Sequence, residues 1–239
     1  MIEKAFKTST LVMPDHPLEG ITTDPTWLDV PVNRIMAIVG LCLFLMTFLS
    51  FLRILPTLLD CLSRGRANTT MEHNLQLKRT RDLILLAYLI IQAILFDRFD
   101  LIPSERIAAL PPGVSLAACA GVMGAYFAIR QIAHSIIHPK SSRSLQNETV
   151  AASHHVCYNC IIILTAAMLV TTGILCLTKA EDSVFRLVLW IEIGVFYLIN
   201  LIRTGEILLP YEGVFTTFLY LCGLEFLPTA LLIAGVLYL

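Results

Sequence analysis

The stretch VFTTFLYLCGLEFLPTALLIAGVLYL, residues 214–239, is almost entirely apolar and contains one carboxylic acid, Glu225. A helix needs about 20 mostly apolar residues to cross the ~30 Å hydrocarbon core of a bilayer, and this stretch is long enough. It therefore predicts a transmembrane helix with Glu225 inside the membrane. A carboxylate there costs several kcal/mol unless it is neutral, paired or turned toward a cavity, so Glu225 is a candidate functional residue.

Similar apolar segments fill most of the remaining chain. Of the 239 residues, 56% are hydrophobic and only 15% are charged, and the mean hydropathy is +0.76, far from the composition of an average soluble domain. The segments are continuously apolar over helix length, which argues against a membrane β-barrel. We therefore predict an all-α, polytopic transmembrane helix bundle of about six spans, at residues 33–58, 82–101, 114–137, 156–177, 184–203 and 214–239.

The amino-terminal residues 1–32 differ from this pattern. Four prolines, at 14, 17, 25 and 31, exclude a long regular helix, so we expect an irregular tail before a transmembrane domain of residues 33–239. The predicted spans place most of the 17 Lys and Arg residues on one side, which the positive-inside rule makes cytoplasmic, with both termini non-cytoplasmic. The residues on that side are Arg53, Arg64, Arg66, Lys78, Arg79, Arg81, Arg130, Lys140, Arg143 and Arg203.

Several classes of partner and cofactor are disfavoured. The net charge is −1, and no Lys/Arg-rich stretch is interleaved with aromatic residues, so nucleic acid is not an expected partner. The seven cysteines are scattered through apolar segments and do not indicate a disulfide framework. No nucleotide-binding or catalytic signature is present, and no cofactor is expected. The expected partners are the lipid bilayer, other membrane proteins or a second copy of the chain.

Glu192 and Glu225 form the first candidate site. If the last two helices run in opposite directions, helical rise places both carboxyl groups at nearly the same depth. Two interpretations remain open. As neighbours, they would share a proton and serve a relay; alternatively, each bonds to a backbone carbonyl or to Gln92 and simply joins helices. Pro228 lacks an N–H group and leaves the Leu224 carbonyl without its helical donor, so it belongs to the same candidate site.

A second candidate site is basic. Arg130 and His134 lie four residues apart and share a helix face, and Arg53 is predicted at a similar depth on the first helix. Together they would bind a phosphate or lipid headgroup at the inner leaflet. The alternative is that the long side chains reach toward the interface and the histidine lies near a helix end.

A third pattern, H-H-x-C-x-x-C, contains His154, His155, Cys157 and Cys160. Imidazole and thiolate are ligands that zinc prefers, but successive residues of one helix do not readily surround a metal. No second cysteine pair lies nearby to complete a tetrahedral site. We therefore expect no metal, and we regard these four residues as weak candidates, with a redox-active thiol pair or ordinary packing as the alternatives.

The string from Phe218 to Pro228 carries an F-L-Y-x-C-x-L-E-x-x-P pattern. It resembles the closing motif of an uncharacterised family of multi-pass inner-membrane proteins from Bacteroidota, a domain of unknown function. The resemblance covers about eleven residues, and the rest of the chain agrees with it only in hydrophobic layout. It implies a bacterial inner membrane and singles out Glu225 and Pro228, but it implies no mechanism.

These observations favour a non-enzymatic scaffold or accessory subunit of a cell-envelope complex, multi-pass in the inner membrane. Two alternatives remain open. One is a small membrane enzyme or lipid-phosphate-handling protein that uses the basic pocket. The other is a proton-coupled transporter that uses the carboxyl pair.

Overall fold

The structure of the chain is a computed structural model. It describes residues 27–63, 71, 74–102, 104, 107, 110–111, 113–137 and 144–238. For some of these residues only the backbone is described, namely 134–137, 144–154, 211–212, 224 and 236–238. The predicted irregular tail, residues 1–32, falls almost wholly outside it as well.

The described chain is helical, which confirms the all-α prediction. A short 3₁₀ helix, η1, precedes the first long helix, and a π-helical segment, η2, lies within the last one. The elements are η1 (Trp27–Asp29), α1 (Pro31–Ser63), α3 (Leu75–Arg98), α5 (Val114–Ile137), α6 (Ser144–Leu177), α7 (Asp182–Leu221), η2 (Cys222–Phe226) and α8 (Leu227–Tyr238).

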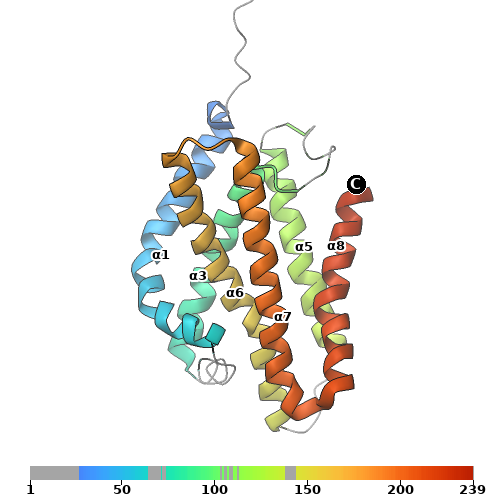
Figure 1. Cartoon of the computed structure of the whole chain (residues 1–239). Helices are drawn as coiled ribbons and strands as arrows, with labels where there is room; N and C mark the ends of the chain where they lie inside the picture. Colours follow the sequence, from blue (N-terminus) through green and yellow to red (C-terminus); the bar gives the residue numbers. More distant parts are fainter. Residues whose placement is uncertain are drawn as a thin grey trace, which may run out of the picture.

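The long helices stand side by side and alternate in direction (Figure 1). The most extensive packing joins α6 to α7; α3 packs against α1, α5 and α6, while α8 packs against α5. The described chain begins and ends at the same end of the bundle (Figure 1). At that end the Asp97 carboxylate accepts hydrogen bonds from the Trp27 indole, at 2.8 Å, and from the Ser115 hydroxyl. These bonds tie η1 and the start of α5 to the end of α3.

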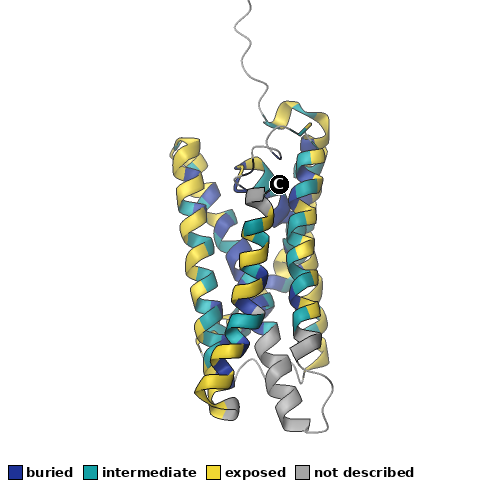
Figure 2. Ribbon diagram, turned by 90° about the vertical axis from the view of Figure 1, so that its right-hand side faces the viewer, coloured by how far each residue is buried: buried dark blue, intermediate teal, exposed yellow. Residues whose placement is uncertain are grey.

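The helices are packed around an apolar core, and apolar residues also cover the outside. Leu58, Tyr88 and Leu189 are fully buried in the main cluster, which joins α1, α3, α6 and α7. Figure 2 shows buried residues on the inward faces and exposed residues on the outward faces of the helices. On α1 the outward face is rich in large apolar residues, and Met46 is 80% exposed. A surface of this kind suits lipid rather than water.

Length and composition identify a membrane protein. Within the described residues, four helices are long and apolar enough to cross a bilayer, and they lie at Pro31–Ser63, Val114–Ala133, His155–Leu177 and Asp182–Pro210. We predicted six spans. α3 is not among the four because charged residues occupy both of its ends, and α8 alone has only 12 residues. The number of spans therefore stays a prediction.

The chain reverses direction inside α7, at Gly213. This residue has φ 76° and ψ 165°, and Pro210 lies three residues before it. Such a conformation is essentially restricted to glycine because a Cβ atom would clash with the backbone. The reversal falls between the predicted spans 184–203 and 214–239, and it sends the end of the chain back along the bundle (Figure 1).

Replacing Gly213 by alanine tests this reversal. We expect Gly213→Ala to lower the free energy of unfolding by about 1–3 kcal/mol, because alanine must adopt a disfavoured conformation. Thermal or chemical unfolding of the purified protein in detergent measures it. Gly194→Ala is the matched control, since Gly194 is helical on the same element and a Cβ there meets open space. Equal effects of the two changes would show that positive φ does not hold the reversal.

Candidate functional site

Glu225 lies where the last helix is locally widened. In η2 the Leu227 N–H donates to the Cys222 carbonyl, five residues back, in place of the usual four. Pro228 follows at once and is buried, and it has no N–H to continue the α-helical pattern. A widened turn of this kind changes the direction in which the neighbouring side chains point, compared with a regular helix. η2 packs against α5.

The Glu225 carboxylate binds two side chains from other helices. Arg130 on α5 donates from Nη2 to one carboxylate oxygen, and Asn200 on α7 donates from Nδ2 to the other at 3.0 Å. The three side chains are almost completely shielded, with exposed fractions of 0% for Glu225, 2% for Arg130 and 4% for Asn200. The carboxylate therefore joins α5, α7 and η2 through charge-assisted hydrogen bonds.

The backbone carbonyl of Glu225 has its own donors. The Thr229 hydroxyl donates to it at 2.7 Å, and the Tyr197 hydroxyl donates to it at 3.3 Å from α7. The Tyr197 ring also meets Phe226 edge to face. Two hydroxyl groups, one from α8 and one from α7, thus donate to this carbonyl in an apolar environment.

The opposite charges of Arg130 and Glu225 offset the cost of burying them. Each ion alone would lose its hydration at a cost of several kcal/mol, and only a close, hydrogen-bonded partner offsets that loss. The Cys157 thiol of α6 lies beside the guanidinium, so four helical segments meet at this point. We call Arg130, Glu225, Asn200, Tyr197 and Thr229 the polar cluster.

A cavity lies next to the polar cluster. It has a volume of about 390 Å³, and its wall is almost wholly apolar. Tyr197, Asn200 and Thr229 of the cluster reach this wall, together with Cys157 and Cys160. Arg130 and Glu225 are not part of the wall, so the paired charges lie behind it.

The predicted neighbourhood of Glu192 and Glu225 is not found. Glu192 is only partly buried, and it accepts a hydrogen bond at 3.3 Å from the Thr171 hydroxyl of α6. Glu225 instead uses both carboxylate oxygens on Arg130 and Asn200. Helical rise gave the two acids similar depths, but it does not determine which neighbour each helix face meets. Of the two interpretations, these contacts favour the one in which each acid has its own partner and joins helices, although neither partner is Gln92.

The basic residues do not form one pocket either. Arg53 is exposed on α1, whereas Arg130 is buried beside Glu225. The side chain of His134 lies outside the described residues. The structure thus places the two arginines in different surroundings, and it pairs Arg130 with an acid from the other candidate site.

The H-H-x-C-x-x-C residues are also separated. The side chain of His154 is not described, His155 lies near Arg81, and Cys157 and Cys160 line the cavity. No group of three or more potential metal ligands occurs in the described part of the chain.

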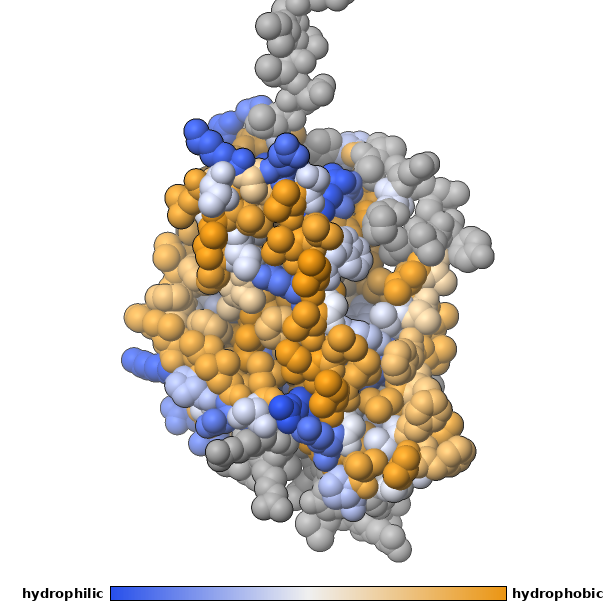
Figure 3. Space-filling model, in the orientation of Figure 1, coloured by the Kyte–Doolittle hydropathy of each residue, from blue (hydrophilic) through white to orange (hydrophobic). Residues whose placement is uncertain are grey.

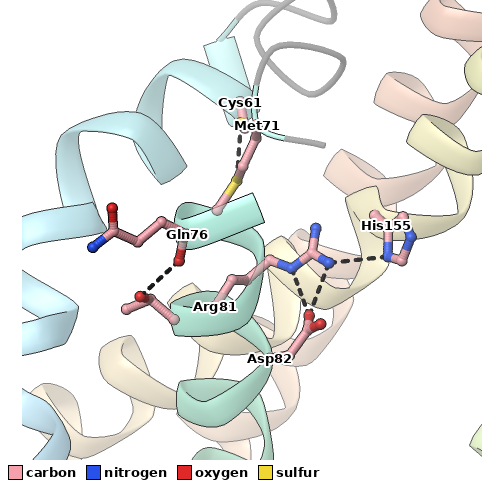
Figure 4. Close-up of polar contacts among 7 residues, drawn as sticks. Cys61, Met71, Gln76, Arg81, Asp82 and His155 are labelled. Atoms are coloured by element: carbon pink, nitrogen blue, oxygen red, sulfur yellow. Dashed lines mark hydrogen bonds and ion pairs between the residues drawn. The ribbon is translucent and has the colours of Figure 1, made fainter. Parts of the chain in front are cut away.

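His155 belongs instead to a second polar contact, between α3 and α6 (Figure 4). Arg81 is fully buried and donates to the Asp82 carboxylate at 2.8 and 3.0 Å, while its Nη2 lies 3.3 Å from His155 Nδ1. The guanidinium also lies 5.9 Å from the ring centroid of Tyr158. Because arginine only donates, His155 Nδ1 can take part in this contact only as an acceptor. Sequence reasoning assigned Arg81 only to topology and missed this contact.

No family model, no curated protein and no solved structure matches this sequence. The resemblance of residues 218–228 to a Bacteroidota family therefore stays a prediction.

A double-mutant cycle measures the buried pair. Arg130→Met leaves the Glu225 charge without its cationic partner, and we expect it to lower the free energy of unfolding by about 3–5 kcal/mol. Adding Glu225→Gln should restore part of that loss, because no buried charge remains and glutamine still offers Asn200 an acceptor oxygen. Unfolding of the purified proteins in detergent gives the four values.

The control is the more accessible pair Arg203 and Glu206, three residues apart on α7, whose side chains are 23% and 50% exposed. Arg203→Met and Glu206→Gln should each change the free energy of unfolding by less than about 1 kcal/mol and should combine additively. Additive losses at Arg130 and Glu225 would contradict a coupled ion pair.

Proposed function

We propose that the chain is a non-enzymatic scaffold or accessory subunit of a cell-envelope complex, located in the inner membrane of a bacterium. One observation carries this proposal. Both carboxylate oxygens of Glu225, the most deeply buried acid among the described residues, are engaged by side chains of neighbouring helices. A group used in this way holds helices in place, which is the role expected of a structural subunit.

The same contacts weigh against the two alternatives. A proton relay through Glu192 and Glu225 needs the acids to exchange protons, but they have separate partners on different helices. A phosphate site needs arginines that converge, but Arg130 is neutralised by Glu225 and Arg53 is exposed on α1. The inner-membrane location rests on the motif resemblance and on the apolar helices.

The size of the native particle tests the scaffold proposal. The tagged chain, expressed from its own locus and extracted in mild detergent, should elute as a larger particle than the same chain produced alone in an unrelated host. Light scattering gives the mass of each particle without its detergent. Identical masses would overturn the proposal of a complex.

Glu225→Gln, made in the same locus, separates structure from chemistry. We expect the membrane abundance of the variant to fall several-fold, because a stability loss of about 1–2 kcal/mol has that effect in cells. The amount of complex and the complementation of a deletion strain should fall in the same proportion. Glu206→Gln, which changes an exposed carboxylate of α7, is the control and should leave all three quantities unchanged. A variant that is abundant and assembled but fails to complement would show that Glu225 acts chemically.

A further inference from the structure

The cavity beside the polar cluster extends along α7. On α7 its wall extends from Trp190 to Asn200, which corresponds to about 15 Å of helix. This length is half of the ~30 Å hydrocarbon thickness of a bilayer. The volume of about 390 Å³ falls within the range of roughly 300–1,000 Å³ that is usual for sites of small molecules.

The cavity reaches the lipid-facing surface between α7 and α8. Trp190 of α7 and Ile233 of α8 both line it, and they are 49% and 52% exposed. Above η2, α8 packs against α5, and Figure 3 shows a hollow between α7 and α8 on this face of the molecule. Since α7 is one of the helices apolar enough to cross a bilayer, this opening faces the hydrocarbon region.

The interior offers hydrocarbon contacts and very little polar surface. Four helices, α3, α5, α6 and α7, contribute large apolar side chains to the wall: Phe96, Phe127, Leu164 and Phe196. The two amide residues of the wall, Gln92 and Asn200, are at most 5% exposed, and the charges of Arg130 and Glu225 lie behind them. A polar headgroup would lose its hydration here without compensation, whereas an apolar chain would lose nothing.

We propose that this cavity binds one acyl chain of a bilayer phospholipid. The headgroup stays at the membrane surface near the start of α7, and the chain enters between α7 and α8. It passes Trp190 and runs along α7 toward Asn200 and Cys157. This site does not depend on the scaffold proposal, because binding a lipid chain requires no partner protein.

A photoactivatable lipid tests the site. The whole chain is reconstituted in phosphatidylcholine vesicles that contain a phosphatidylcholine with a diazirine at the end of one acyl chain. After illumination, peptide mass spectrometry locates the adducts. We expect adducts on the segment 157–164 of α6, whose buried residues Cys157, Cys160 and Leu164 line the cavity. Adducts at Leu45 and Met46 on the outer face of α1 report ordinary contact with bulk lipid.

Filling the cavity should remove only the internal adducts. Val122→Phe on α5 places a ring in the cavity, and Val195→Phe makes the same change on the exposed face of α7, outside the cavity. We expect Val122→Phe to lower labelling of 157–164 at least about tenfold, since the chain loses most of its apolar burial there. Val195→Phe should leave it unchanged, and labelling of α1 should be equal in every protein.

Ile193→Phe, which fills the cavity from α7, replaces Val122→Phe if the latter does not fold, as judged by gel filtration and melting. Internal adducts that are absent from the parent protein, or that persist in a filled and folded variant, would overturn the proposal. A photoactivatable isoprenoid that labels 157–164 much more strongly than the phospholipid at equal concentration would overturn the acyl assignment.

Discussion

Two opposite charges held away from water determine how the last third of this bundle is arranged. Arg130 and Glu225 are separated by 95 residues, and neither can be buried alone without a cost of several kcal/mol. Helices in a membrane gain little from apolar contact with one another, because lipid chains are equally apolar. A specific polar contact therefore has a larger share in selecting one arrangement than it would in a soluble core. Here it selects the arrangement in which η2 faces α5 and α7 together.

The backbone is adapted to that contact. A regular α-helix cannot continue through Pro228, and η2 widens the helix before it. Within this widened turn the backbone carbonyl of Glu225 accepts hydrogen bonds from the Thr229 and Tyr197 hydroxyls. Glu225 thus has two separate sets of donors: Arg130 and Asn200 bind its carboxylate, whereas Thr229 and Tyr197 bind its backbone carbonyl. The helix distortion and the ion pair thus occur at the same place in the chain. Glu225, Pro228 and Thr229 all lie within one turn there.

The sequence predicted the helical class, because a continuous apolar run of helix length can satisfy its backbone hydrogen bonds inside a membrane only by forming a helix. It also predicted that Glu225 is buried and lies beside a helix break. It did not predict the partner of Glu225. Depth follows from rise per residue, but facing direction depends on the rotation and tilt of each helix, which packing decides. Glu192 has a depth similar to that of Glu225 by helical rise, but its side chain meets Thr171 of α6 instead. Arg130 was assigned to the membrane surface, although an arginine and an acid inside one bundle are expected to pair.

The same contact accounts for the cavity. The chain leaves Gly213 in the reverse direction and is tied to α5 and α7 at η2. Beyond Pro228 no described ion pair joins α8 to α7, and α8 follows α5 instead (Figure 1). Two helices that are fixed together at one level and diverge above it must leave a wedge between them. In a soluble protein, large side chains would fill such a wedge, because an apolar void forfeits dispersion contacts. A membrane supplies an alternative filling from the bilayer itself, so selection for tight packing of α7 against α8 is relaxed.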